Sequence, residues 1–282
     1  MPGIDCRTAF ISDIHLGTRD CRAAYLLDFL QRLHCERLVL VGDVFDLWAM
    51  RRRVVWTDAQ SAVVEHVFAL ADQGIEVIYI PGNHDEALRA LIGTEIRGVR
   101  FLRTLEHQTA DGRRFLVSHG DEFDDEVRHS RLQHWCGDIG YHALLRLGHW
   151  VDRARRYMGR PYWSLSAWAK TRVGRARDYI GRFEAAATTV ARDQGYDGYI
   201  GGHIHKAAIS SRDGVLYCNT GDWVEHCTAL VEDQHGFLHL VHWSDHGRVD
   251  ASDTVSQDND STRTISLPPE LAWLRATTPG TH

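Results

Sequence analysis

The sequence lacks several patterns that mark large classes of protein. None of its six cysteines stands in a Cys-x-x-Cys pair, so zinc-finger spacing is absent, and their scatter favours reduced thiols. No apolar run approaches the ~20 residues of a membrane-spanning helix. The first predicted strand begins near Arg7, which leaves no room for a signal peptide. We therefore expect a cytoplasmic protein with at most a peripheral contact to a membrane.

An excess of positive charge and internal repeats are also absent. The formal net charge is −6, which argues against a protein that coats nucleic acid with its whole surface. The chain has 282 residues, 44% of them hydrophobic, enough for a sizeable α/β core. From about Asp245 the sequence becomes rich in Asp, Ser and Thr. We expect residues 1–245 to form one domain and residues 246–282 to be a disordered tail.

Short β-branched runs alternate with amphipathic segments in the first half of the chain. Strands are predicted over 8–11, 38–41 and 77–80, with helices over 22–34 and from the capping box at 57–60 to Gly74. This alternation favours βαβ units with parallel strands. Further strands are predicted over 115–118, 199–200, 215–218, 228–231 and 238–241, with a hairpin turn at 213–214.

Five short runs carry residues that bind hard divalent metals, and four of them directly follow a predicted strand. They are Asp13-Ile14-His15, Gly42-Asp43-Val44-Phe45-Asp46, Gly82-Asn83-His84-Asp85, His119-Gly120-Asp121 and Gly202-His203-Ile204-His205. Ligands in open α/β folds bind where strands end, so we expect these side chains to meet. Together they indicate a dinuclear centre that cleaves phosphate esters.

The five runs offer seven candidate ligands with oxygen or imidazole donors. These are Asp13, His15, Asp43, Asn83, His119, His203 and His205. Such donors suit manganese, the preferred assignment, as well as Mg²⁺, Fe²⁺ or Zn²⁺. Asp43 is the natural bridge, since one carboxylate can bind two ions that hold a hydroxide between them. His84 is predicted to bind the phosphate and protonate the leaving oxygen, with Asp85 orienting its ring.

In this order the motifs resemble those of the calcineurin-type metallophosphoesterases, over residues 9 to about 243. The resemblance implies an α/β fold, a two-sheet β-sandwich flanked by helices. It also implies two ligand sets. One is Asp13, His15, Asp43 and His205, and the other is Asp43, Asn83, His119 and His203.

The closer resemblance is to the branch that contains the UDP-2,3-diacylglucosamine diphosphatases of the lipid A pathway. It is carried by Ser12-Asp13-Ile14-His15-Leu16-Gly17, by Gly42-Asp43-Val44-Phe45-Asp46-Leu47-Trp48 and by a helical insertion between His119 and His203. It implies hydrolysis of this lipid nucleotide to UMP and a lipid phosphate, in the cytoplasm or at the inner membrane.

Two departures from that branch leave alternatives open. His84 stands where the established diphosphatases carry Arg in Gly-Asn-Arg-Asp, and their Cys-Thr-Asp-Asp pattern does not follow His119. One alternative is a phosphodiesterase or nuclease that acts on other diesters. The other is a non-catalytic scaffold that binds partners. The sequence does not indicate an oligomeric state.

The insertion, 122–182, is predicted to be a helical lid. Its segment 146–182 contains ten cations, two acids and interleaved aromatics, which gives it a charge of +8. We expect it to face an anion, namely a pyrophosphate-linked lipid, a membrane surface or, less favoured, a nucleic acid backbone. The predicted substrate contacts are Asn83, His84, Asp125, Ser166, Lys170 and Arg172.

Overall fold

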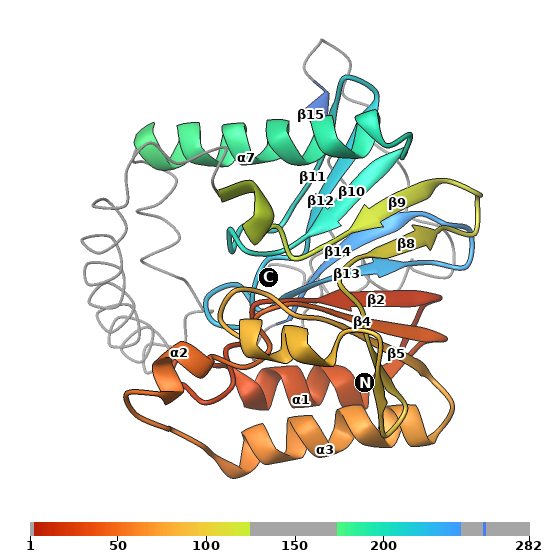
Figure 1. The fold of residues 1–282 in the computed structure, drawn as a ribbon. Coiled ribbons are helices and arrows are strands. Elements are labelled where there is room, and N and C mark those ends of the chain that lie inside the picture. Colours follow the sequence, from red (N-terminus) through yellow and green to blue (C-terminus); the bar gives the residue numbers. More distant parts are fainter. Residues whose placement is uncertain (1–2, 125–173, 244–255, 258–282) are drawn as a thin grey trace, which may run out of the picture.

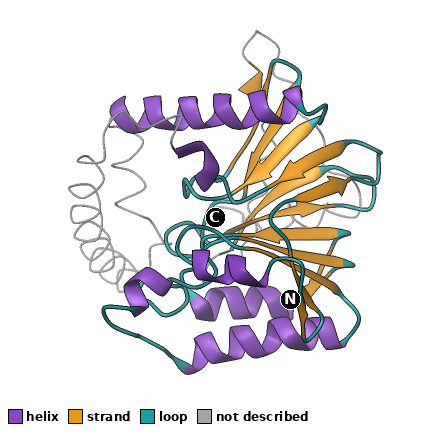
Figure 2. Ribbon diagram, viewed as in Figure 1, coloured by secondary structure: helices purple, strands orange, loops and turns teal. Residues whose placement is uncertain are grey.

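The computed structural model describes residues 3–124, 174–243 and 256–257. These residues form four layers, with two β-sheets packed face to face and helices covering each outer face (Figure 1). Figure 2 shows the helices on the outside and the strands of both sheets in the middle. The predicted α/β two-sheet fold flanked by helices is therefore confirmed.

The larger sheet has the strand order β14-β13-β2-β4-β5-β7-β6. Its centre, from β2 to β7, is parallel, whereas β13, β14 and β6 pair antiparallel with their neighbours. The strands are β2 (Thr8–Ile11), β4 (Arg37–Val41), β5 (Glu76–Ile80), β6 (Glu95–Ile96), β7 (Val99–Phe101), β13 (Thr228–Glu232) and β14 (Leu238–His242).

The outer face of this sheet is covered by helices α1 (Ala23–Gln31) and α3 (Asp58–Asp72), and a short helix α2 (Leu47–Met50) precedes α3. Side chains alternate along β2, so that Ala9 and Ile11 pack toward the helices and Phe10 packs into the core between the sheets. Thr57 caps α3 by accepting a hydrogen bond from Gln60 N–H at 3.3 Å, as the capping motif predicted.

The smaller sheet has the order β15-β11-β12-β10-β9-β8 and is covered by α7 (Gly174–Asp193). The strands are β8 (Leu105–Gln108), β9 (Arg114–Val117), β10 (Gly198–Gly201), β11 (Ala208–Arg212), β12 (Val215–Asn219) and β15 (Ser256–Gln257). The predicted hairpin joins β11 to β12. Asp213 and Gly214 have φ of 50° and 82°, the left-handed conformation that a two-residue I′ turn requires.

Four small elements complete the described residues. They are the strand pair β1 (Ile4–Asp5) and β3 (Leu33–His34) and the 3₁₀ helices η1 (Glu86–Leu91) and η2 (Asp121–Phe123). The sequence did not predict β1, β3, β6, β7, β8, β11 or β15. Of the predicted tail from 246 only β15, which pairs with β11, is described, and most of the predicted lid lies outside the described residues. No helix in the described part combines the length and apolar character needed to cross a bilayer.

Candidate metal centre

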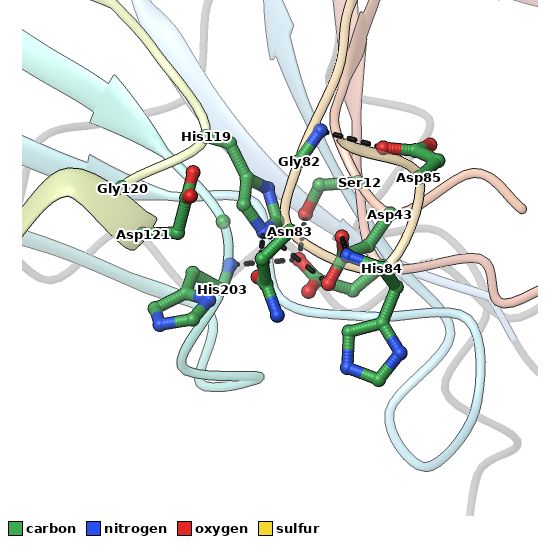
Figure 3. Close-up of polar contacts among 12 residues, drawn as sticks. Ser12, Asp43, Gly82, Asn83, His84, Asp85, His119, Gly120, Asp121 and His203 are labelled. Carbon is green, nitrogen blue, oxygen red and sulfur yellow. Dashed lines mark hydrogen bonds and ion pairs between the residues drawn. The ribbon is translucent and has the colours of Figure 1, made fainter. Parts of the chain in front are cut away.

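The predicted ligands all follow strands whose carboxyl ends meet at one edge of the sandwich. Asp13 follows β2, Asp43 follows β4 and Asn83 follows β5 in the larger sheet, whereas His119 follows β9 and His203 follows β10 in the smaller one. Figure 3 shows Asp43, Asn83, His119 and His203 converging from these different segments. Five segments spread over the chain therefore contribute to one site, as the sequence predicted.

The first cluster consists of Asp13, His15 and His205, whose ligand atoms all lie within 4.8 Å of one another. His205 Nε2 is 3.1 Å from Asp13 Oδ1 and 3.2 Å from His15 Nε2. Adjacent ligand atoms around an octahedral ion with bonds of about 2.1 Å are about 3 Å apart, so this spacing fits a bound cation.

The second cluster consists of Asp43, His119 and His203, again within 4.8 Å. His119 Nε2 is 3.3 Å from Asp43 Oδ2 and 3.3 Å from the amide oxygen Oδ1 of Asn83. The amide oxygen adds a neutral donor of the kind that Mg²⁺ or Mn²⁺ accepts.

Asp43 connects the two clusters. Its Oδ2 is 3.3 Å from His119 Nε2 in the second cluster and 4.0 Å from His15 Nε2 in the first. Its other oxygen, Oδ1, accepts a hydrogen bond from the backbone N–H of His84 at 2.8 Å. The side chain is buried. One carboxylate oxygen is thus held by the protein, and the other faces both clusters.

Two observations test whether these residues fit metal ions. Asp13 Oδ2 accepts hydrogen bonds from Ser12 and from His203 N–H, whereas the buried Oδ1 faces His205 Nε2 at 3.1 Å and has no other donor among the described residues. Because a buried carboxylate oxygen requires a donor or a cation, this atom can bind a metal ion when His205 Nε2 carries no proton. The donor set of carboxylate, imidazole and amide oxygen is also that of hard divalent ions. The residues fit two such ions.

Hydrogen bonds to the second ring nitrogen fix which nitrogen of each histidine faces the site. Nδ1 of His119 lies 2.9 Å from the Val41 carbonyl oxygen, and Nδ1 of His15 lies 3.1 Å from Asp46 Oδ2. Since these acceptors cannot donate, Nδ1 carries the proton in both rings. In the neutral form of each ring Nε2 is therefore the lone-pair nitrogen, as metal binding requires.

The charges of the clusters perturb one another strongly. Burial opposes ionisation of Asp43, but the charge and hydrogen bond of His119, with the charges of His15 and His84, hold the pKa of its carboxyl well below its usual range. Burial likewise opposes protonation of His15, yet Asp46, Asp43 and Asp13 raise its pKa to about 9. The pocket therefore has a concentrated negative potential that attracts cations.

The backbone at the site is held in conformations that side chains rarely adopt. Positive φ values occur at eight non-glycine residues of the described chain, and five of these are predicted ligands: Asp13, His15, Asp43, His203 and His205. Such residues cost about 1–3 kcal/mol each and cluster at functional sites. The close packing at the site also requires glycine at position 82, since a Cβ on Gly82 would lie 2.7 Å from His119 Cδ2 and 2.8 Å from Asp43 N.

The partner of His84 differs from the prediction. Asp85 does not contact the His84 ring. It is buried, and its carboxylate accepts hydrogen bonds from Gly82 N–H at 2.6 Å, Val44 N–H at 2.9 Å and the Tyr79 hydroxyl at 2.5 Å. Figure 3 shows Asp85 turned away from the His84 ring. Asp85 therefore stabilises the loops of the site, because its carboxylate oxygens accept hydrogen bonds from the backbone donors and Tyr79.

The carboxylate beside His84 belongs to Asp46, the N-cap of α2. Asp46 Oδ1 lies 3.0 Å from His84 Nδ1 and also accepts from Ala49 N–H at 2.8 Å. One carboxylate thus orients a predicted ligand, His15, and the predicted acid, His84. Asp46 lies in the run Gly42-Asp43-Val44-Phe45-Asp46, so the sequence contained a signal for this role.

A further loop supports the ligands from behind. Asn219 donates to the Gly202 carbonyl at 2.7 Å, Thr220 lies 2.5 Å from Ser12, and Trp223 N–H donates to the Asp13 carbonyl at 3.0 Å. The loop that follows β12 therefore positions Asp13 and the segment that carries His203. Asp121, in the run that begins at His119, pairs with Arg89 at 2.6 Å.

Two neighbours of the site escaped the sequence analysis. Asp124 Oδ1 lies 2.9 Å from His203 Nε2, and the Trp48 ring lies 4.5 Å from that of His84, between centroids. Both contacts join segments far apart in the sequence. The other predicted substrate contacts, Asp125, Ser166, Lys170 and Arg172, lie outside the described residues.

Comparisons with known proteins identify a family and similar chains. Residues 6–207 match the model of the family described as calcineurin-like phosphoesterase. The UDP-2,3-diacylglucosamine hydrolase of Haemophilus influenzae (strain PittGG) is 25% identical over 238 residues, 79% of this chain and 93% of the relative. That of Xanthomonas campestris pv. campestris (strain 8004) is 28% identical over 243 residues, 81% and 96%. The solved structure of Yfce, a phosphoesterase from E. coli, matches at 15% identity with a TM-score of 0.43, over 86% of this chain and 95% of that one.

Proposed function

We propose, since the chain belongs to the calcineurin-like phosphoesterase family and is a metal-dependent hydrolase, that it cleaves the pyrophosphate bond of UDP-2,3-diacylglucosamine. The products would be UMP and the acylated sugar phosphate. Two divalent ions, with manganese preferred, would be held by the clusters that meet at Asp43. The predicted membership of this family is confirmed by the family match.

The observation that supports a dinuclear site most directly is the position of the Asp43 carboxylate. Its Oδ2 faces His15 on one side and His119 on the other, and among the described residues only these rings lie beside that oxygen as possible donors. When bound, two ions there would generate an attacking hydroxide from water at neutral pH and offset the charge of the phosphate.

The chain's own residues would position and protonate the substrate. With Nδ1 of His84 directed at Asp46, its Nε2 is the atom left to reach a phosphate or leaving oxygen. The His84 side chain is 27% exposed, so substrate can reach it. The His84 backbone N–H also fixes the Asp43 carboxylate, which couples the position of the acid to that of the bridge. Asp46 keeps the imidazole in one orientation and tautomer.

The lipid nucleotide is proposed from the relatives, which are named UDP-2,3-diacylglucosamine hydrolases and align over most of this chain. Residues 122–182 are proposed as a lid whose cations contact the distal part of this substrate. Asp125, Ser166, Lys170 and Arg172 stay predictions drawn from the sequence. Peripheral contact of residues 146–182 with a membrane likewise stays a prediction drawn from the sequence.

A second candidate is a phosphodiesterase that acts on other diesters, including nucleic acid. The observation that favours it is His84, a ring acid beside Asp46, at a position where the diphosphatase branch carries Arg. A histidine can protonate a poor leaving group that arginine cannot, because the pKa of arginine is too high.

The test is product analysis with the full chain and Mn²⁺. UDP-2,3-diacylglucosamine and a single-stranded oligonucleotide are offered separately at equal concentration, and products are identified by mass spectrometry. The proposal predicts UMP and the lipid phosphate, with at least 100-fold lower efficiency on the oligonucleotide. Cleavage of the oligonucleotide alone would establish the second candidate. Lys170→Ala should impair cleavage of the true substrate, because the lid cation is proposed to contact the distal part of a large substrate.

A further inference from the structure

A short segment beside the metal centre exposes apolar side chains. Five large hydrophobic residues are exposed in the described part of the chain, and three of them lie between residues 47 and 57. They are Trp48 at 40% exposure, Val54 at 55% and Trp56 at 39%. Such a concentration of exposed apolar side chains in one segment indicates a binding surface.

The same segment carries three consecutive cations. Arg51, Arg52 and Arg53 are exposed, and none of the three forms an ion pair with another residue that the structure describes. By contrast, the exposed Arg97, Arg100 and Arg114 pair with acids. The nearest acids in the sequence are the buried Asp46 and the exposed Asp58, so residues 47–57 have a net charge of +3.

Hydrogen bonds and stacking hold the segment in place. Val55 N–H donates to the Gly17 carbonyl at 3.0 Å, and Arg53 N–H donates to the Ala49 carbonyl at 2.9 Å. The Trp56 indole donates to Ser61 Oγ at 2.8 Å while its ring stacks on Phe45. The apolar side chains of residues 47–57 are therefore held in a fixed arrangement before any partner binds.

The surface adjoins the candidate catalytic residues. The Trp48 ring lies 4.5 Å from the His84 ring, between centroids, and its indole lies 3.4 Å from Glu86. Figure 1 shows α2 and the segment that follows it at the edge of the molecule on the side where strands β2 and β4 end. A partner bound to the segment would thus lie next to the site.

We propose that residues 47–57 dock the protein on an anionic lipid bilayer. Exposed arginines that have no acidic partner among the described residues can bind the negative surface of such a bilayer, and Trp and Val enter its interface. Guanidinium groups flanked by tryptophan match a phospholipid headgroup layer in both charge and polarity. The inference rests in part on the proposed function, because a diacylated substrate resides in a bilayer and would reach His84 directly from it.

The test measures binding of the full chain to vesicles by sedimentation. The probes are phosphatidylcholine vesicles with and without 30% phosphatidylglycerol, and they contain no lipid nucleotide. Wild type should bind the anionic vesicles preferentially. Replacing Arg51, Arg52 and Arg53 with Ala should weaken that binding on the order of 100-fold, since each cation near the surface contributes a factor of about five. Val54→Ser should weaken it further without removing charge.

A matched variant controls for net charge. Changing Arg97, Arg100 and Arg114 to Ala removes the same charge from ion-paired arginines elsewhere and should weaken binding less than 5-fold. Equal losses in the two triple variants would overturn the inference, as would binding lost only on changing Lys170 and Arg172. If the chain cleaves UDP-2,3-diacylglucosamine in detergent but does not bind the vesicles, that result overturns this inference alone. A chain that binds vesicles through 47–57 without cleaving that substrate overturns only the proposed function.

Discussion

Asp46 Oδ1 lies 3.0 Å from Nδ1 of His84, a residue 38 positions further along the chain. The other oxygen of the same carboxylate lies 3.1 Å from His15 Nδ1. One side chain therefore orients a metal ligand and the proposed acid together. This arrangement links the affinity for metal to the protonation step, and it makes Asp46 the first target for substitution.

Asp46→Asn should weaken the first metal site and slow turnover. The amide can still cap α2, but its NH₂ group opposes the N–H of His15 or His84 and favours the wrong tautomer. We expect a 10–100-fold loss of metal affinity, the usual effect of removing a partner of a ligand. Competition with a chromogenic chelator measures it. Asp28→Asn, at a surface ion pair, is the control, and equal affinities for the two variants would refute the role of Asp46.

His84→Ala should separate chemistry from metal binding. His84 forms a third cluster with His15 and Asp46 but lies outside the two clusters that meet at Asp43, so two metal equivalents should remain bound. Turnover of a chromogenic phosphodiester should fall roughly 10²–10⁴-fold, the range for loss of general acid–base catalysis. Elemental analysis and kcat are measured on the same preparation, with the exposed His34→Ala as control. Loss of one metal equivalent would instead make His84 a ligand.

Gly82→Ala should damage the metal centre although it adds only one methyl group. The new Cβ would lie under 3.0 Å from the Asp43 backbone and the His119 ring, so one of the two must move. Overpacking of this kind typically costs about 1–3 kcal/mol. Gly181→Ala, within α7, meets no atom within 4 Å and should be neutral or stabilising. Thermal unfolding and metal content of the two variants are compared. An intact metal centre in Gly82→Ala would show that the expected steric clash of the new Cβ does not occur.

Glu232 should govern part of the acid stability. Its fully buried carboxylate accepts from Ala110 N–H at 2.8 Å and lies 2.7 Å from Arg7 and 2.9 Å from His107. Burial opposes its ionisation, but His107, Ala110 and Arg7 lower the pKa to about 2. Because the folded pKa is below the unfolded one, the stabilisation is present above about pH 4.3 and is lost as the pH falls toward 2.

Glu232→Gln should therefore remove about 3 kcal/mol of unfolding free energy at pH 7, a figure of order-of-magnitude precision. Its stability should then change less than that of wild type between pH 4.5 and 2. Urea unfolding at several pH values measures both effects. Glu106→Gln, at an exposed ion pair with Arg114, should leave the pH profile almost unchanged. Parallel profiles for wild type and Glu232→Gln would rule out this role.

The sequence predicted the central strands and the ligands well because their signals are local. Four of the five ligand runs directly follow an apolar run, and β2 spans the predicted residues. The strands between 95 and 108 carried weaker signals. Glu95–Ile96 is exposed and only every second residue of Val99–Phe101 is buried, so no apolar run marks them.

Contacts between distant segments were harder to predict. The sequence suggested Asp85 as the partner of His84 because the two are neighbours, whereas the fold turns them apart and brings Asp46 to the ring. Gln60 shows the same limit. It follows Thr57 at capping-box spacing, yet its side chain bonds Gly17 N–H at 2.9 Å and the Thr18 carbonyl at 2.8 Å in a different loop. Such pairings depend on how the layers pack.

The central claim is that two divalent ions share Asp43, and metal stoichiometry tests it most directly. The chain is stripped with chelator, reloaded with Mn²⁺, desalted and analysed for manganese per chain. We predict two equivalents in wild type, one in His205→Ala, one in His119→Ala and fewer than one in Asp43→Ala, with all four proteins folded by circular dichroism. One equivalent in wild type, or two in Asp43→Ala, would contradict the account.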